Sequence, residues 1–218
     1  DMSAKQLTDK ESKKFSWSPD GKYILYLEGT EEKADWFDIL VVEIKSGEKK
    51  RLTIKEENDN WTVDEPSWSP DGSRVAYLYR PRSTQPLDGG DLWTMDRDGG
   101  GKLLLSYEDD GVTAFSWSPT EKELLYEKRR MEGDKYIRNI WKMDATGGDK
   151  VNLTDFPRDS YKGLWSPSGT KIAYIMEGGV WTMNSDGSNK AILVAGSGDI
   201  SFSFSPAGDR LALLLPSE

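Results

Sequence analysis

The segment Phe15-Ser16-Trp17-Ser18-Pro19-Asp20-Gly21, followed by the apolar run Tyr23-Ile24-Leu25-Tyr26, decides the fold because the chain repeats it. Bulky and small residues alternate in its first half, which is the period of a strand with its aromatic side chains on one face. Pro-Asp-Gly favours a tight turn, since proline fixes φ and glycine accepts a positive φ. The apolar run is rich in strand-forming residues. The segment therefore predicts a strand, a turn and a second strand paired with the first.

Further copies of this hairpin follow along the chain, beginning at Pro66, Phe115, Leu164 and Phe202. A second hairpin lies between successive copies, beginning at Asp38, Asp91, Asn139 and Gly179. Each pair of hairpins gives a unit of four antiparallel strands, and the units recur at about 40 to 50 residues, as in propeller repeats. One four-stranded sheet cannot cover its own two apolar faces, whereas sheets stacked around an axis cover each other. The repeat therefore predicts an all-β fold, a β-propeller of four-stranded antiparallel blades.

We expect a single β-propeller domain over residues 1–218. The predicted blades cover about residues 14–53, 65–106, 113–154 and 162–193, and residues 199–218 with 4–8 form the fifth. The last assignment depends on Lys5-Gln6-Leu7-Thr8, which resembles the closing strand Lys50-Arg51-Leu52-Thr53. The N-terminal strand would then complete the last blade and close the ring. The alternative is that the chain is a piece of a ring of six or more blades.

Composition excludes several classes of function. The net charge of −9 and the pI of about 4.8 disfavour nucleic-acid binding, because phosphate backbones would be repelled. No apolar stretch is long enough to predict membrane insertion. The sequence contains neither histidine nor cysteine, so a Ser-His-Asp triad, a Cys-His pair, a thiolate or imidazole zinc site and a disulfide are all excluded. We therefore expect no catalytic residue, cofactor or metal site in this chain.

Two further sets of acidic residues have ordinary explanations. Asp96-Arg97-Asp98-Gly99 has too few ligand positions for a calcium loop and is predicted to be a hairpin turn. The adjacent acids Glu56-Glu57 and Asp109-Asp110 could serve a glycosidase, but adjacent acids in polar loops are usually solvated.

The predicted topology separates short turns from long connections. In a four-stranded antiparallel blade, the first and third turns share one side, and the other connections share the opposite side. The first side carries only short turns such as Pro-Asp-Gly. The long connections are predicted at residues 27–38, 54–65, 80–90, 107–112, 127–138 and 155–162. Because binding surfaces are usually built from variable loops on a regular scaffold, we expect binding on the long-connection side.

Aromatic and arginine residues in these connections are the candidate binding residues. Trp17, Trp68, Trp93, Trp117, Trp141, Trp165 and Trp181 fall at repeat positions, where packing explains them. The predicted binding residues are Trp36, Phe37, Trp61, Arg80, Arg82, Tyr107, Arg129, Arg130, Tyr136, Arg158 and Tyr161. Rigid rings beside guanidinium groups are typical of protein interfaces. The alternative is that these rings fold back onto the scaffold.

The repeat resembles a known family. Trp17-Ser18-Pro19-Asp20-Gly21, together with Ile172-Ala173-Tyr174 and Trp93-Thr94-Met95-Asp96, is similar to the WD-like repeat of TolB-type β-propellers. The same repeat occurs in the propeller domains of prolyl oligopeptidase-family peptidases and in oligogalacturonate lyases. The resemblance implies a propeller in the bacterial periplasm, cell envelope or extracellular space. These residues include no counterpart of the separate α/β domain of TolB, the Gly-x-Ser-x-Gly element of the peptidases or the histidines of the lyases.

Three functions are compatible with these residues. The first is a non-catalytic binding or scaffold propeller that recognises a protein or peptide partner through its long-connection side. The second is a carbohydrate-binding or glycosidase-like propeller, in which loop aromatics stack on sugars. The third is the substrate-gating propeller domain of a larger peptidase, so that only the parent protein would be an enzyme.

Overall fold

The computed structural model describes residues 6–30, 36–53, 61–81, 89–106, 111–120, 122–154, 157–196 and 200–214. These residues form strands, turns and connections, and the described part of the chain contains no helix that could cross a membrane. The chain divides into two compact units, Asp1–Tyr107 and Glu108–Glu218.

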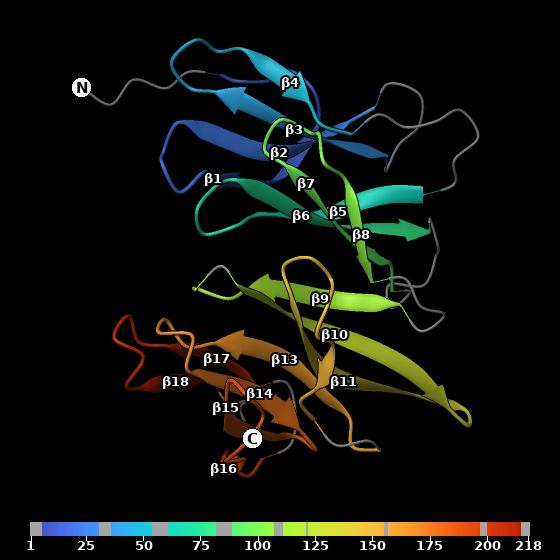
Figure 1. Cartoon of the computed structure of the whole chain (residues 1–218), viewed down its shortest axis with the longest axis vertical. Helices are drawn as coiled ribbons and strands as arrows, with labels where there is room; N and C mark the ends of the chain where they lie inside the picture. The colour runs from blue at the N-terminus through green and yellow to red at the C-terminus, as the bar shows by residue number, and fades with distance from the viewer. Residues whose placement is uncertain are drawn as a thin grey trace. The chain divides into compact units, whose positions relative to one another are not determined.

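The first unit contains two four-stranded antiparallel sheets (Figure 1). The first blade consists of β1 (Ser12–Trp17), β2 (Tyr23–Gly29), β3 (Phe37–Glu43) and β4 (Lys49–Arg51). The second blade consists of β5 (Trp61–Trp68), β6 (Arg74–Pro81), β7 (Asp91–Asp96) and β8 (Leu103–Ser106). In each sheet the strands lie side by side in chain order, as the two-hairpin repeat predicts.

The second unit repeats this arrangement (Figure 1). The third blade consists of β9 (Val112–Trp117), β10 (Glu123–Glu132), β11 (Lys135–Asp144) and β12 (Val151–Asn152). The fourth consists of β13 (Ser160–Trp165), β14 (Lys171–Met176), β15 (Gly179–Asn184) and β16 (Ala191–Val194). The strands β17 (Ser201–Phe204) and β18 (Leu211–Leu214) form a further hairpin. These sheets confirm the predicted all-β propeller class. Ring closure by residues 4–8 stays a prediction.

A buried serine fixes the first turn of the repeat. In the first blade, the Ser18 hydroxyl accepts the Tyr23 N–H at 3.0 Å and donates to Asp20 at 2.6 Å. In the fourth blade, the Ser166 hydroxyl accepts the Lys171 N–H at 3.0 Å. The serine of Ser-Pro-x-Gly therefore bonds the backbone at the start of the second strand, a role that the sequence pattern alone did not indicate.

Apolar side chains from facing blades form the core of each unit. In the first unit, Leu25 and Ile39 of the first blade pack in one cluster with Trp68 and Tyr77 of the second. In the second unit, Leu125, Ile140 and Leu153 of the third blade pack with Trp165 and Tyr174 of the fourth, among others. The core therefore lies between sheets, as the repeat predicts.

Close approach between facing blades requires glycine in two of the turns. A Cβ atom on Gly72, where φ is +69°, would lie 3.2 Å from Pro19 in the equivalent Ser-Pro-Asp-Gly turn of the first blade. A Cβ atom on Gly99, where φ is +86°, would lie 3.2 Å from the backbone of Leu52 in the preceding blade. The turns of neighbouring blades therefore stack directly on each other within the first unit.

The first blade differs from the others at the repeat tryptophan. Trp165 is 5% exposed, whereas Trp17 at the equivalent position is 56% exposed. Trp17 is the cross-strand partner of Ile24, so the two side chains lie on the same face of the first blade. On this face Leu7 packs against a small cluster that includes Tyr26. No sheet among the described residues of the first unit covers this face. The packing role expected for Trp17 is thus not seen within its unit.

Candidate functional site

The strands extend further than the sequence predicted, and most candidate residues lie in them. Residues assigned to long connections occupy β3 (Phe37), β5 (Trp61), β6 (Arg80), β10 (Arg129 and Arg130), β11 (Tyr136) and β13 (Tyr161). Their assignment to loops was wrong, because a strand needs backbone pairing and tolerates polar side chains where it leaves the core. Trp36 and Arg158 do lie in connections. Arg82, Tyr107 and the acid pairs Glu56-Glu57 and Asp109-Asp110 lie outside the described residues.

The candidates of the first unit contact their own sheets. Trp36 and Phe37 are buried, and the Lys13 ammonium lies 3.7 Å from the centre of the Phe37 ring. Trp61 stacks on Tyr79 with 5.2 Å between ring centres. These contacts fit the alternative that the rings fold back onto the scaffold.

The side chain of Arg80 is also largely covered. Its Nε atom lies 3.9 Å from an oxygen of Asp64 on the neighbouring strand β5. The four described candidates of this unit therefore do not form one exposed cluster.

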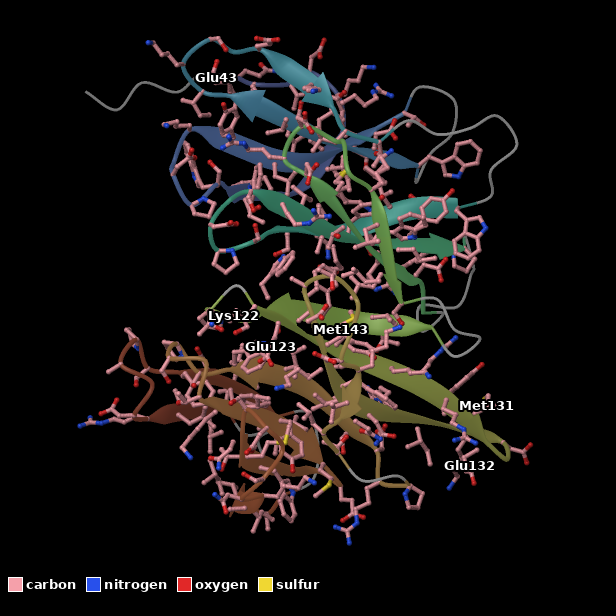
Figure 2. All side chains as sticks on the ribbon, viewed as in Figure 1. Glu43, Lys122, Glu123, Met131, Glu132 and Met143 are labelled. Carbon is pink, nitrogen blue, oxygen red and sulfur yellow. The ribbon has the colours of Figure 1, made fainter. Side chains whose placement is uncertain are left out.

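The β10–β11 hairpin of the second unit carries the strongest cluster of candidates. β10 and β11 pair along their full length, from Glu123 with Asp144 to Glu132 with Lys135. By contrast, β9 pairs with β10 only as far as Lys128. The hairpin therefore extends past its sheet as a two-stranded ribbon, defined here as residues 129–138 (Figure 1). Met131 and Glu132 lie at its far end (Figure 2).

One face of the ribbon combines arginine, tyrosine and methionine side chains. Arg129 is directly opposite Arg138, and Met131 is directly opposite Tyr136. Because side chains alternate along a strand, these four residues share a face. The Arg129 guanidinium lies 4.2 Å from the centre of the Tyr136 ring, and that of Arg138 lies 3.8 Å from the centre of the Tyr161 ring. We call Arg129, Met131, Tyr136, Arg138 and Tyr161 the Arg–Tyr face.

An ion pair attaches the base of the ribbon to the segment before β13. The Arg138 guanidinium donates to both oxygens of Asp159, at 3.1 and 2.6 Å. The backbone N–H of Arg138 donates to the same carboxylate at 2.8 Å. Burial lowers the pKa of Arg138, but the hydrogen bonds and charge of Asp159 outweigh it and raise the pKa above its ordinary value. Arg138 is therefore a fixed cation, with Tyr161 against its plane.

Met131, Arg138 and Asp159 were absent from the predicted site. The sequence does contain a signal for the ribbon: Gly133-Asp134 lies at its centre, and Gly-Asp between two strands predicts a tight hairpin. Gly133 has a φ of 58°, as such a turn needs. Alternation on either side of this turn would have placed Met131 and Arg138 beside Arg129 and Tyr136.

A partly buried carboxylate lies beside the ribbon base. Glu127 accepts the N–H of Lys162 and the hydroxyl of Thr113, the latter at 3.3 Å. Lys162 has a φ of 55°, so the carboxylate stabilises a strained bulge in β13. Burial raises the pKa of Glu127, although these hydrogen bonds and the charge of Arg138 act in the opposite direction. The adjacent cavity of about 30 Å³ has room for about one water and not for a substrate, so the carboxylate of Glu127 has a structural role.

The side of the short turns carries a groove in the first unit that the sequence did not predict. The groove has a volume of about 330 Å³ and is lined by Tyr23, Val41, Glu43, Glu48, Lys50, Arg97 and Asp98. The Arg97 guanidinium lies 5.0 Å from the centre of the Tyr23 ring. Charges of both signs surround it, so the lining selects no single class of ligand.

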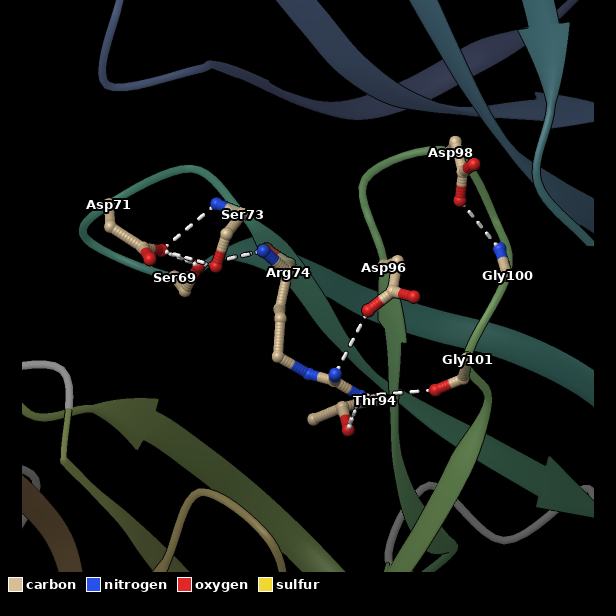
Figure 3. A network of polar contacts seen from close by, with 9 residues as sticks. All are labelled: Ser69, Asp71, Ser73, Arg74, Thr94, Asp96, Asp98, Gly100 and Gly101. Atoms are coloured by element: carbon tan, nitrogen blue, oxygen red, sulfur yellow. Dashed lines mark hydrogen bonds and ion pairs between the residues drawn. The ribbon is translucent and has the colours of Figure 1, made fainter.

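Close to this groove, the turns of the second blade are joined by a polar network (Figure 3). Arg74 donates to Asp96 at 3.0 Å, to the Thr94 hydroxyl at 2.8 Å and to the Gly101 carbonyl at 3.1 Å. Asp98 accepts the Gly100 N–H at 2.9 Å, which confirms the predicted hairpin turn. These polar groups hold the turns together. Among the described residues no group of three acids could hold a metal ion.

The model of the TolB beta propeller domain family matches residues 3–208 of this chain. The chain belongs to this family. The TolB-like chain is 31% identical over 126 residues to "Uncharacterized peptidase YuxL" of Bacillus subtilis, a match covering 57% of the chain and 19% of that protein. It is 29% identical over 129 residues to the Tol-Pal system protein TolB of Anaeromyxobacter dehalogenans, covering 53% of the chain and 25% of that protein. The chain thus spans a quarter or less of the length of these relatives.

A solved structure from a study of two prolyl endopeptidases shows the same fold as the TolB-like chain. The TM-score is 0.74 at 15% identity, and the match covers 95% of the chain and 32% of that structure. The expected family and the β-propeller fold are therefore both confirmed.

Proposed function

We propose that this chain is a non-catalytic binding propeller that recognises a protein or peptide partner through the Arg–Tyr face. The observation that carries the proposal is the pair of arginine–tyrosine stacks: Arg129 on Tyr136 within the ribbon, and Arg138 on Tyr161 of β13 in the next blade. Tyrosine, arginine and methionine are the residues enriched in protein interfaces.

Exposure of the ribbon end supports this function. Met131 is 47% exposed and Tyr136 is 51% exposed, and they are cross-strand partners. Two large side chains left in water at the end of a ribbon contribute little to folding, whereas a partner that covers them would gain binding energy. The ribbon also belongs to the second-to-third strand connection, on the side where binding was predicted.

The relatives set the wider context of the proposal. One is named as a component of the Tol-Pal system, which favours a protein partner and a place in the bacterial envelope. The absence of histidine and cysteine limits the catalytic chemistry that these residues could perform alone.

Selection from a library of random displayed peptides tests this function. We expect peptides that bind the intact chain and bind at least tenfold more weakly to the double variant Met131→Ser/Tyr136→Ser, because interface anchors of this kind are each worth about 1 kcal/mol or more. The matched control is Ile192→Ser/Leu193→Ser, since these residues are 48% and 50% exposed on β16. Selected peptides that bind all three proteins equally would refute the assignment of the surface.

A second candidate is the propeller domain of a larger peptidase, in which the propeller controls access of substrates. The match to a protein named as a peptidase and the likeness to a prolyl endopeptidase structure favour it. The reading frame of the parent protein tests it: a hydrolase domain with Gly-x-Ser-x-Gly would support this candidate, and a frame without one would refute it.

A further inference from the structure

We infer that the segment bound by the Arg–Tyr face is acidic: an extended peptide with a carboxylate two positions from an apolar side chain. The inference rests on the proposed function and names the class of partner.

The charge of the ribbon is opposite to that of the whole chain. Residues 129–138 contain the basic side chains of Arg129, Arg130, Lys135 and Arg138, against the two acids Glu132 and Asp134. The chain as a whole has a net charge of −9. A basic ribbon on an acidic protein attracts anionic segments to one place, because the rest of the surface repels them.

The two arginines of the face are opposed across the ribbon. Arg129 and Arg138 are direct cross-strand partners, an arrangement in which like charges are destabilising. Asp159 offsets this cost for Arg138 through two of the five N–H donors of the guanidinium. The remaining three donors have no acceptor among the described residues, and the side chain is partly exposed. A carboxylate on the face would supply an acceptor and reduce the repulsion.

The tyrosine stacks prepare the arginines for such a ligand. Each guanidinium lies against a ring, at 4.2 Å for Arg129 and 3.8 Å for Arg138. Stacking on Tyr161 restricts the plane of the Arg138 guanidinium while leaving donors at its edge, which is the geometry that binds a carboxylate with two parallel hydrogen bonds. The cost of ordering these side chains is therefore met before the partner binds.

The spacing of the cross-strand pairs, called rungs below, predicts the sequence pattern of the partner peptide. The Met131–Tyr136 pair and the Arg129–Arg138 pair are two residues apart on each strand. At about 3.3 Å per residue this separation is about 6 to 7 Å, the distance between residues i and i+2 of an extended peptide. When an apolar side chain of the peptide packs on Met131 and Tyr136, the peptide side chain two positions away therefore lies over Arg129 and Arg138.

Three labelled peptides test the partner class by fluorescence anisotropy on the intact chain. All contain Phe-x-Phe-x-Glu in an extended Ser/Thr background, with the glutamate retained, changed to Gln or changed to Lys. We expect the Gln peptide to bind at least tenfold more weakly than the Glu peptide, the Lys peptide to bind more weakly still, and the affinity of the Glu peptide to fall as salt is added. Equal affinities for the Glu and Gln peptides would overturn the inference.

Charge reversal on the protein provides the second arm. Arg129→Glu should weaken binding of the Glu peptide and strengthen binding of the Lys peptide. Arg210→Glu, an exposed change on the last hairpin, should alter the affinity of neither peptide. Arg129→Gln, which adds no acid to the ribbon, should also bind the Glu peptide at least tenfold more weakly while keeping the circular dichroism spectrum of the folded protein. Unchanged binding by both Arg129 variants would overturn the inference.

The library selection separates the two proposals. Ribbon-dependent peptides without enrichment in acidic residues would overturn the acidic partner and leave the proposed function standing. A selection that yields no ribbon-dependent peptide would count against the proposed function itself.

Discussion

Replacing Trp165 with alanine should destabilise the second unit by about 3 to 5 kcal/mol. The side chain is 5% exposed and packs with Leu125, Ile140 and Tyr174. A buried tryptophan removes about 200 Å² from water, worth about 5 kcal/mol at about 25 cal/mol per Å². Residual structure in the unfolded chain lowers this value by about 10 to 40%, and the cavity left behind raises it again. The indole Nε1 has no acceptor in the described part of the chain, so the loss is one of packing.

Trp17→Ala is the matched comparison, because Trp17 occupies the same repeat position but is 56% exposed. Its expected cost is about 1 to 2 kcal/mol, in proportion to the smaller buried area. Urea unfolding followed by far-ultraviolet circular dichroism measures both variants under the same conditions. Equal losses of unfolding free energy would refute the reasoning, since the contacts within each unit would then not determine the cost.

Three further predictions concern the second unit. Glu127→Gln should gain stability relative to the wild type as the pH rises from about 4 to 8, which melting curves at several pH values would show. The folded-state pKa of Glu127 is raised, so the wild type loses stability as the pH rises through that pKa, whereas the glutamine variant does not. Gly163→Ala should cost about 1 to 3 kcal/mol in urea unfolding, because its Cβ atom would lie 2.8 Å from the Leu125 side chain; a gain in stability would contradict this packing. Ser166→Ala should cost about 1 to 3 kcal/mol, because the buried hydroxyl accepts the N–H that starts β14. Ser168→Ala, at an exposed position, should cost less than about 0.5 kcal/mol by thermal melting.

The blades could be predicted from sequence because each level of the pattern agrees. Alternation, turn residues and the apolar run all give the same hairpin around Ser18 and Gly21, and the copies repeat it. Phe37 was assigned to a loop because it closely follows the polar stretch at residues 31–35, and the sequence does not show the sheet that covers it. Its burial depends on packing against the second blade, which no local pattern records.

The ribbon could be predicted only in part. Arg129, Arg130 and Tyr136 were selected for their chemistry, but Lys128 to Arg138 has too few apolar residues to show a strand. Arg138 is paired with an acid 21 positions further along the chain, and Tyr161 comes from the next blade. Contacts of this range are set by the stacking of blades, so the sequence could supply the residues of the surface but not their arrangement.

The two-residue period of the ribbon limits how its length can change. Adding two rungs would lengthen it and keep Met131 and Tyr136 on the same side as Tyr161, because alternation returns after two residues. Adding a single rung would turn the outer part over and present Arg130 and Ile137 positions instead. Among natural variants of this chain, hairpins of different reach should therefore differ by even numbers of rungs, and an odd step would mark a protein that meets its partner from the opposite side.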